Sequence, residues 1–274
     1  MNYEKLAELL FPHIDKTPAD YEAMYPARDL PAGAKVTRLG PSPTGFIHLG
    51  NLYGAFVDER LAHQSGGKFF LRIEDTDDKR YVEGAVEIII NSLRFFGIQF
   101  DEGATMNGDI GDYGDYTQSH RGEIYRCFAK KLVAEGHAYP CFLTEEEIAE
   151  IHAKQEAEKA NPGIYGKWAL SRNLTMEEIE ANLAAGKPHV IRFNMPTEGT
   201  TTFHDEIYGD ITVPNEELDD LILIKSDGYP TYNFANVIDD HLQGITHVVR
   251  GNEYLSSAPK YNRLYEAFGW EVPT

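Results

Sequence analysis

The sequence contains few cysteines and no long apolar run. Two cysteines, Cys127 and Cys141, occur in 274 residues, and no C-x-x-C pair is present. This pattern supports neither a disulfide framework nor a four-cysteine zinc site. No apolar run approaches the roughly 20 residues that a membrane-spanning helix needs. The start, MNYEKLAELL, carries an early acid and lacks the apolar core of a signal peptide. We therefore expect a cytoplasmic protein with no membrane partner.

Basic residues are also scarce. The chain carries 25 lysines and arginines against 44 aspartates and glutamates, a formal net charge of −19. This balance argues against a protein that coats nucleic acid non-specifically, since such binding needs a basic face. It leaves room for a nucleic-acid substrate held by a local basic strip, because nearby residues set the field in a cleft. The length and the 42% of hydrophobic residues allow one large domain or two moderate ones.

Hydrophobic periodicity predicts an α/β organisation for the first part of the chain. Residues 1–34 are predicted to form a helical extension, and residues 35–117 alternate strands with helices. The stretch 102–117 is rich in glycine and aspartate and is predicted to be a loop. The predicted elements are strands at 35–39 and 68–73 and helices at 51–65 and 82–96.

A different pattern follows at 118–225. Helices alternate there with short strands, which is typical of an α+β insertion, and Thr144-x-x-Glu147 is a capping box at one helix start. Residues 226–274 return to the first pattern and are predicted to be the second half of the α/β domain. The insertion has predicted helices at 121–135 and 175–185 and strands at 190–194, 200–204 and 209–213. We expect one parallel sheet of strands 35–39, 68–73, 221–225 and 246–249, with a helix at 257–268.

The stretch Thr37–Asn51, TRLGPSPTGFIHLGN, joins a strand to a helix through a turn-rich loop. Pro41, Pro43 and Gly45 keep helix out of this loop. The loop lies at the carboxyl end of its strand, where α/β sheets receive nucleotides and where the next helix points N–H groups at an anion. His48 adds a donor aimed at phosphate. Taken alone, His48 is better explained as a solvent-exposed histidine of an ordinary turn.

The carboxyl ends of the four expected strands would bring seven polar side chains together. A nucleotide or a small anionic ligand would bind at such a place. Two arginines near one acid suit a zwitterion, because guanidinium binds carboxylate bidentately and a Glu or Tyr oxygen accepts from an ammonium. The alternative is a structural ion network of Arg38, Glu74 and Arg250. The seven residues are Arg38, Ser42, His48, Glu74, Tyr232, Asn236 and Arg250.

Four long segments resemble the catalytic part of glutamyl-tRNA synthetases, which are class I aminoacyl-tRNA synthetases. Their order and spacing fit across residues 35–270, including the insertion between the second and third. The resemblance implies a Rossmann-like parallel sheet with a connective domain at 118–225 that grips the tRNA acceptor arm. The segments are TRLGPSPTGFIHLGN, FLRIEDTDDKRYVEGAVE, IKSDGYPTYNFANVIDDHLQGITHVVRGNEYL and RLYEAFGW.

The resemblance implies a glutamate–tRNA ligase that activates L-glutamate with ATP and Mg²⁺ and transfers it to tRNA(Glu), mainly by positioning and electrostatics. His48 and Asn51 stand at the class I HIGH signature as catalytic residues, and His48 would stabilise charge on the α-phosphate. Arg38 would pair with the side-chain carboxylate of glutamate, which explains rejection of glutamine. The implied ATP-binding residues are Ser42, Thr44, Gly45, His48, Gly50, Asn51, Glu253 and Tyr254. The implied glutamate-binding residues are Arg38, Ser42, Glu74, Tyr232, Asn236 and Arg250.

Two departures from the family pattern matter. The second ATP signature, KMSKS, should follow RLYEAFGW after a few tens of residues, and the sequence contains none up to Thr274. We therefore expect a monomeric catalytic-domain fragment that is weakly active or inactive alone. Some members bind zinc through Cys-x-Cys and Tyr-x-x-x-Cys. In this sequence Leu143 stands at the second cysteine of the first motif, and Ala169 stands at the cysteine of the second motif. We therefore expect no structural zinc.

Two other functions stay open. A short paralogue that glutamylates a modified tRNA base, a glutamyl-Q-tRNA synthetase, fits the length, although PSPTG in place of PSPSG argues against it. A non-catalytic fragment that binds glutamate or tRNA fits the missing second signature. Pyrophosphate exchange with glutamate, ATP and tRNA separates these functions.

Overall fold

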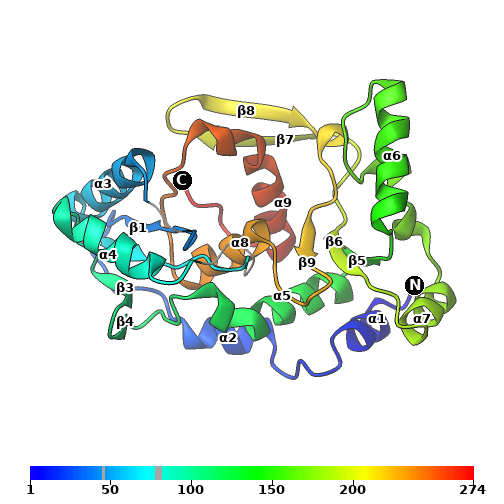
Figure 1. The fold of residues 1–274 in the computed structure, drawn as a ribbon, viewed down its shortest axis with the longest axis horizontal. Helices are drawn as coiled ribbons and strands as arrows, with labels where there is room; N and C mark the ends of the chain where they lie inside the picture. The colour runs from blue at the N-terminus through cyan, green and yellow to red at the C-terminus, as the bar shows by residue number, and fades with distance from the viewer. Residues whose placement is uncertain (45–46, 78–81) are drawn as a thin grey trace. The chain divides into compact units, whose positions relative to one another are not determined.

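The structure, a computed structural model, describes residues 1–44, 47–77 and 82–274. The chain divides into two compact units, which we describe separately. Figure 1 labels the elements of both units. Unit 1 comprises Met1–Pro18, Glu123–Phe234 and Ser256–Glu271, and unit 2 comprises Ala19–Gly122, Ala235–Leu255 and Val272–Thr274.

Unit 2 is built on a four-stranded sheet in the order β1-β2-β3-β4. β1 pairs with β2 and β2 with β3 in parallel, whereas β3 and β4 form an antiparallel hairpin. Phe69, Phe70 and Leu71 are fully buried, as expected for a central strand of a parallel sheet. The strands are β1 (Val36–Leu39), β2 (Lys68–Leu71), β3 (Glu102–Thr105) and β4 (Gly108–Ile110). The helices are α3 (Leu49–Gln64), α4 (Ala85–Phe95), η2 (Gln118–Arg121) and most of α2 (Pro18–Met24), α8 (Tyr232–Leu242) and η6 (Asn252–Ser256).

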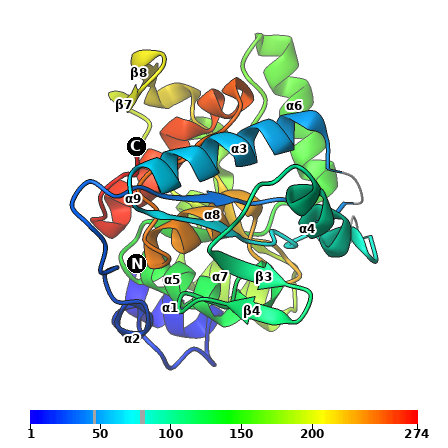
Figure 2. The same cartoon turned by 90° about the vertical axis from the view of Figure 1, so that its left-hand side faces the viewer.

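Strand β1 directs alternate side chains to opposite faces of the sheet, since successive strand residues point in opposite directions. The Thr37 hydroxyl donates to the backbone oxygen of Asp58 in α3 at 2.7 Å. The next residue, Arg38, reaches Asp240 in α8 instead. Figure 2 shows α3 along one face of β1. Polar side chains on the α8 face are therefore enclosed between the sheet and a helix.

Unit 1 contains an antiparallel three-stranded sheet in the order β5-β6-β9 and a separate hairpin, β7-β8. Phe128 of α5 packs edge-on against Phe268 and Trp270, with ring centroids 5.6 and 5.4 Å away. The strands are β5 (Ala138–Cys141), β6 (Val190–Phe193), β7 (Thr200–Asp205), β8 (Gly209–Pro214) and β9 (Ile222–Ile224). The helices are α1 (Tyr3–Leu10), α5 (Gly122–Ala134), α6 (Glu145–Glu158), η3 (Gly166–Trp168), η4 (Leu170–Asn173), α7 (Met176–Ala184), η5 (Asn215–Glu217) and α9 (Ala258–Phe268).

The expected α/β architecture and most predicted elements are confirmed. The capping box at α6 forms both of its bonds, Thr144 N–H to Glu147 Oε2 at 2.8 Å and Glu147 N–H to Thr144 Oγ1 at 3.2 Å. No helix among the described residues combines the length and apolarity that a membrane crossing requires. Within the same ranges, no group of three or more His, Cys, Asp or Glu side chains is arranged to hold a metal ion.

The prediction of one sheet with four parallel strands is wrong. β9, within the predicted strand 221–225, pairs antiparallel with β6 in unit 1, because an apolar run indicates burial but not the sheet in which a strand lies. The stretch 246–249 carries no assigned strand. It nevertheless bonds β1, since the Thr246 N–H donates to the Val36 backbone oxygen at 3.0 Å.

The predicted loop at 102–117 is also wrong in part, because it contains the hairpin of β3 and β4. Thr105 pairs with Gly108 across a two-residue turn, and Gly108 has φ +102°. Such a backbone conformation favours glycine. The two-residue turn itself is Met106-Asn107, and asparagine and glycine are residue types that favour such turns.

Candidate functional site

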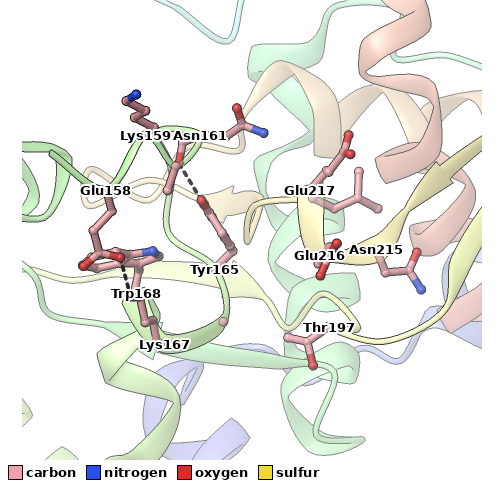
Figure 3. A pocket seen from close by; sticks show the side chains of 13 residues that line it. Glu158, Lys159, Asn161, Tyr165, Lys167, Trp168, Thr197, Asn215, Glu216 and Glu217 are labelled. Carbon is pink, nitrogen blue, oxygen red and sulfur yellow. Dashed lines mark hydrogen bonds and ion pairs between the residues drawn. The ribbon is translucent and has the colours of Figure 1, made fainter. Parts of the chain in front are cut away.

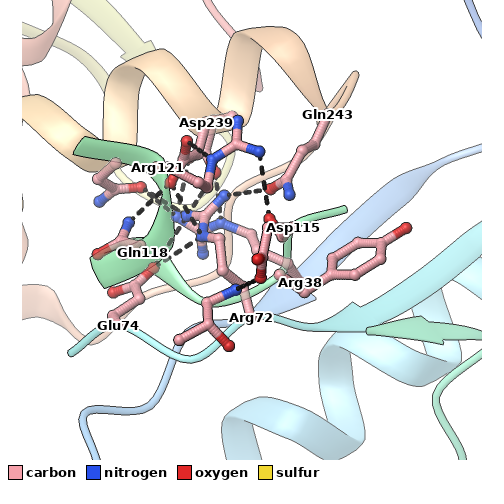
Figure 4. A network of polar contacts seen from close by, with 12 residues as sticks. Arg38, Arg72, Glu74, Asp115, Gln118, Arg121, Asp239 and Gln243 are labelled. Carbon is pink, nitrogen blue, oxygen red and sulfur yellow. Dashed lines mark hydrogen bonds and ion pairs between the residues drawn. The ribbon is translucent and has the colours of Figure 1, made fainter. Parts of the chain in front are cut away.

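A group of buried polar side chains lies between the sheet of unit 2 and α8 (Figure 4). We call it the buried polar cluster. Each member is at most 4% exposed, so each must find hydrogen-bond partners in the protein or in a ligand. Its members are Arg38, Arg72, Glu74, Gln118, Arg121, Asn236, Asp239, Asp240 and Gln243.

Arg38 is held on one side by α8. Its Nε donates to Asp240 Oδ1 and its Nη2 to Asp240 Oδ2, each at 2.9 Å. Nη2 also donates to Asn236 Oδ1 at 3.0 Å. No hydrogen bond joins Nη1 to a residue that the structure describes. The guanidinium plane is therefore fixed by a bidentate carboxylate while one edge keeps donors for a ligand.

Arg72 is fully buried and bonds to four cluster members. Nε and Nη2 both donate to Glu74 Oε1, at 3.2 and 2.9 Å. Nη2 also lies 3.2 Å from Asn236 Oδ1 and 2.9 Å from Asp240 Oδ1. Nη1 donates to Gln243 Oε1 at 2.9 Å. Arg72 thus connects the strand end at Glu74 with two side chains of α8, Asn236 and Asp240, and with Gln243, which follows that helix.

Two of the predicted glutamate-binding residues, Glu74 and Asn236, each have a buried atom without a hydrogen-bond partner within the described ranges. These atoms are Glu74 Oε2, an acceptor, and Asn236 Nδ2, a donor, and the Oε1 atom of Gln118 is unpaired as well. A buried polar atom that stays unpaired costs on the order of 1–3 kcal/mol. A ligand that offers a donor to Glu74 and an acceptor to Asn236 would remove this cost at both residues.

Burial and the two arginines act on the acids in opposite directions. Burial raises the pKa of Glu74 above its usual range, although Arg72 and Arg38 oppose this effect. Burial would also raise the pKa of Asp240, but Arg38 and Arg72 outweigh it and hold that pKa at about 2. Asp240 is therefore the ionised partner of both guanidinium groups, and Glu74 is the acid left poorly compensated.

Arg250 lies close enough to the cluster to act on it electrostatically. Its charge lowers the pKa of Asp240 and opposes the burial that raises the pKa of Asp58. The Arg250 guanidinium also stacks 5.2 Å from the centre of the Tyr254 ring. Glu253 is exposed beside them. The structure therefore brings Arg38, Glu74, Asn236 and Arg250 into one electrostatic neighbourhood.

The loop after β1 places its polar residues at the surface. Ser42 and Thr44 are exposed, and the Thr44 N–H donates to the Ser42 backbone oxygen at 2.8 Å. His48 is exposed immediately before α3, and its backbone N–H donates to Asn51 Oδ1 at 3.2 Å. Gly50 lies in the first turn of α3. Gly45, predicted to bind ATP, lies outside the described residues.

Tyr232 belongs to unit 1, at the first residue of α8, and is half-buried. It precedes Asn236 by four residues in the same helix, a spacing that places two side chains on one helix face.

Unit 1 contains a pocket of about 500 Å³ between the end of α6 and η5 (Figure 3). Trp168 lines it, with the Lys167 ammonium 4.5 Å from the ring centre and ion-paired to Glu158. Asn161 and Tyr165 also line it, joined by a 2.7 Å bond from the Tyr165 hydroxyl to the Asn161 backbone oxygen. The polar groups in these contacts are partnered within unit 1, so the pocket by itself indicates no ligand.

Six cluster members were not predicted from the sequence. Four of them lie in segments that carry the family resemblance, whereas Gln118 and Arg121 lie outside those segments. No periodicity distinguishes any of the six from surface charges. One usable signal is Arg72, a charge that directly follows an apolar strand. A second is the pair of acids in a helix with an otherwise apolar face. These six members are Arg72, Gln118, Arg121, Asp239, Asp240 and Gln243.

Proteins of known name are similar in sequence to this chain. The glutamate–tRNA ligase of Acetivibrio thermocellus is 58% identical over 276 residues, covering all of this chain and 50% of that protein. The corresponding ligase of Clostridium perfringens strain 13 is 51% identical over the same span, again 50% of its length. The chain thus spans about half the length of these relatives.

Two solved structures are similar to this chain in both fold and sequence. A crystal structure of a glutamate tRNA ligase from Elizabethkingia meningosepticum, in complex with its amino acid, matches with a TM-score of 0.82 and 41% identity over 87% of this chain and 48% of that one. The Elizabethkingia anophelis glutamate-tRNA synthetase gives 0.83 and 40%, over 88% and 49%. The model of the class I tRNA synthetase (E and Q) catalytic domain matches residues 35–274. The chain therefore belongs to the class I tRNA synthetases of the E and Q group, and its residues 35–274 match their catalytic domain.

Proposed function

We propose that this chain is the catalytic part of a glutamate–tRNA ligase, which activates L-glutamate with ATP and then transfers it to tRNA(Glu). The observation that carries the proposal is the polarity of the buried polar cluster. At Glu74 and Asn236 it leaves one acceptor, Oε2, and one donor, Nδ2, without a partner among the described residues. An amino acid with an acidic side chain offers the matching ammonium and carboxylate groups.

The donors of the cluster are adjacent, because Asn236 Oδ1 accepts from Arg38 Nη2. We assign the side-chain carboxylate of glutamate to Arg38 Nη1 and Asn236 Nδ2. The ammonium then pairs with Glu74 Oε2. The amide of glutamine has one oxygen to accept from one of these donors, but its NH₂ would face the other and leave it unpaired. This penalty is about 1–3 kcal/mol, or roughly 5- to 150-fold in affinity.

Three further residues complete the proposed glutamate site. Arg250 adds a third positive charge near Asp240, beside Arg38 and Arg72, as its effect on the pKa of that carboxyl indicates. Tyr232 begins the helix that carries Asn236. Ser42 lies in the loop that follows β1. We propose that all three contact the bound amino acid.

We propose that ATP, with Mg²⁺ as part of the substrate, binds at the start of α3. The N-terminus of a helix favours phosphate, and His48 lies exposed immediately before it. His48 and Asn51 would act on the α-phosphate while the glutamate carboxylate attacks it. The other proposed ATP-binding residues are Ser42, Thr44, Gly45, Gly50, Glu253 and Tyr254.

The proposed partner is the acceptor arm of tRNA(Glu). We assign its binding to a connective domain at 118–225, inserted between catalytic halves at 35–117 and 226–274 and preceded by an extension at 1–34. A monomeric, cytoplasmic state without structural zinc is part of the same proposal.

Calorimetric titration with glutamyl-sulfamoyl-adenosine, a stable analogue of the glutamyl adenylate, tests the proposed site. We expect the 274-residue chain to bind the analogue, and Arg38→Ala to lose that binding. The matched control is Arg94→Ala, which removes an exposed arginine of α4 and should bind as the wild type does. A folded wild-type chain that does not bind would refute the proposal, as would unchanged affinity in Arg38→Ala.

Pyrophosphate exchange with glutamate, ATP and tRNA tests the completeness of the site. These 274 residues contain no KMSKS-like segment to hold the pyrophosphate side of ATP. We therefore expect exchange near background together with normal binding of the analogue. Robust exchange would show that the chain needs no second signature.

A further inference from the structure

Arg72 contacts both residues whose unpaired atoms define the proposed glutamate site, yet its own side chain is fully buried. We propose that Arg72 is a positioning residue: it determines which atom of Glu74 and which atom of Asn236 face the ligand, and thereby sets the selectivity of the site. The inference rests on the proposed function and deepens it. Figure 4 shows the side chain at the centre of the cluster.

Arg72 determines the orientation of Glu74 by using only one of its oxygens. Nε and Nη2 converge on Oε1, at 3.2 and 2.9 Å. Oε2 is left buried without a partner among the described residues. The carboxylate thus presents a single acceptor in a fixed direction, which suits one ammonium group.

Arg72 also determines the orientation of the Asn236 amide, together with Arg38. The Nη2 atoms of both arginines donate to Asn236 Oδ1, at 3.2 and 3.0 Å. A reversed amide would direct its NH₂ at two guanidinium groups, which cannot accept a hydrogen bond. The amide must therefore present Nδ2, a donor, to the ligand, and this suits a carboxylate.

The arginine is itself held at its far end. Nη1 donates to Gln243 Oε1 at 2.9 Å, and Gln243 Nε2 donates to the Tyr113 backbone oxygen at 3.0 Å. A lysine could supply the charge but not these three directions at once, because its ammonium is a single rotatable group. The planar fork of Arg72 is therefore the feature that the inference requires.

A double-mutant cycle of Glu74→Gln and Arg72→Lys tests the inference, with glutamyl-sulfamoyl-adenosine affinity as the measurement. With Arg72 present, Glu74→Gln must direct the new amide oxygen at the guanidinium. An NH₂ group then replaces the acceptor that faces the ligand, and affinity should fall roughly 10- to 100-fold. In the Arg72→Lys background the single rotatable ammonium can pair with Asp240 and leave position 74, so the new amide can turn its oxygen to the ligand ammonium. Glu74→Gln should then cost at most about 3-fold, a non-additivity that general destabilisation would not produce.

Equal losses in the two backgrounds, with the wild type binding, would overturn the inference and leave the proposed function standing. Absence of binding by the folded wild type would overturn both. Circular dichroism and urea unfolding test whether Arg72→Lys is folded. If it is not, Gln243→Met keeps Arg72 but removes its Nη1 acceptor. Affinity should then fall roughly 3- to 10-fold, and affinity within about 2-fold of the wild type would overturn the inference.

Discussion

Gly40 is the residue at which a single added methyl group should disrupt the buried polar cluster. A Cβ built on Gly40 would lie 2.5 Å from Glu74 Cδ and closer still to Oε1. A surface carboxylate would swing away at little cost, but Glu74 is buried and bonded twice to Arg72. Gly40→Ala must therefore displace the carboxylate from Arg72.

The cost follows from the bonds that break. Each charge-assisted hydrogen bond contributes about 1.5–3 kcal/mol, and separating a buried ion pair typically costs about 3–5 kcal/mol in all. We expect Gly40→Ala to lower the free energy of unfolding by roughly 3 kcal/mol. We also expect it to weaken glutamyl-sulfamoyl-adenosine binding at least about tenfold, because Glu74 Oε2 moves.

Gly54→Ala is the matched control. Gly54 lies inside α3, and a Cβ there would meet no heavy atom within 4 Å. Alanine replaces glycine in a helix interior with a gain of about 1 kcal/mol, so the control should change stability in the opposite direction and leave binding unaltered. Urea unfolding and calorimetry of both variants provide the measurement. A Gly40→Ala chain with wild-type stability and affinity would refute the described placement of Glu74.

Two further predictions concern other buried acids. Burial raises the pKa of Asp58 well above its usual range. Between about pH 4 and the folded-state pKa, the folded chain therefore keeps a proton that the unfolded chain has released. The free energy of unfolding of the wild type falls as pH rises through this range. Asp58→Asn does not titrate, so its stability relative to the wild type should rise between about pH 4 and 7 by at most about 1.4 kcal/mol per pH unit. Urea unfolding at both pH values tests this, and a difference that is independent of pH would contradict it. In unit 1 the Asp220 side chain is fully buried and accepts from Arg172, the Tyr139 hydroxyl and the Met195 N–H. Asp220→Asn should lower the free energy of unfolding by roughly 3 kcal/mol, whereas Asp210→Asn, at the exposed end of β8, should change it by less than about 1 kcal/mol. Equal small effects would show that the Asp220 network contributes little.

The sequence predicted the polar groups of the site better than the framework that holds them. Arg38, Glu74 and Asn236 were expected to lie together, since each belongs to a segment that resembles the family. They do lie together, linked through hydrogen bonds to Arg72 and to one another. Their being brought together does not distinguish a ligand site from an ion network. Arg38 in fact bonds Asp240, which is 202 positions away in sequence, and such long-range pairing leaves no periodic signal.

The fold shows the same division. α3 and α4 were predicted within a few residues, since their length and spacing are local properties. The sheet to which β9 belongs was not predicted correctly, because a run of three apolar residues can pair in the sheet of unit 1 or in that of unit 2. The hairpin of β3 and β4 was missed because abundant glycine and aspartate were interpreted as loop composition. Glycine also permits the positive φ of Gly108, directly after the two-residue turn.

A crystal structure of the 274-residue chain with glutamyl-sulfamoyl-adenosine tests the central claim most directly. We predict the ligand ammonium within hydrogen-bond distance of Glu74 Oε2. We also predict the side-chain carboxylate between Arg38 Nη1 and Asn236 Nδ2, with Arg72 still bonded to Glu74 Oε1. A ligand bound elsewhere, with Glu74 Oε2 and Asn236 Nδ2 still unpaired, would contradict the claim that the buried polar cluster is the glutamate site.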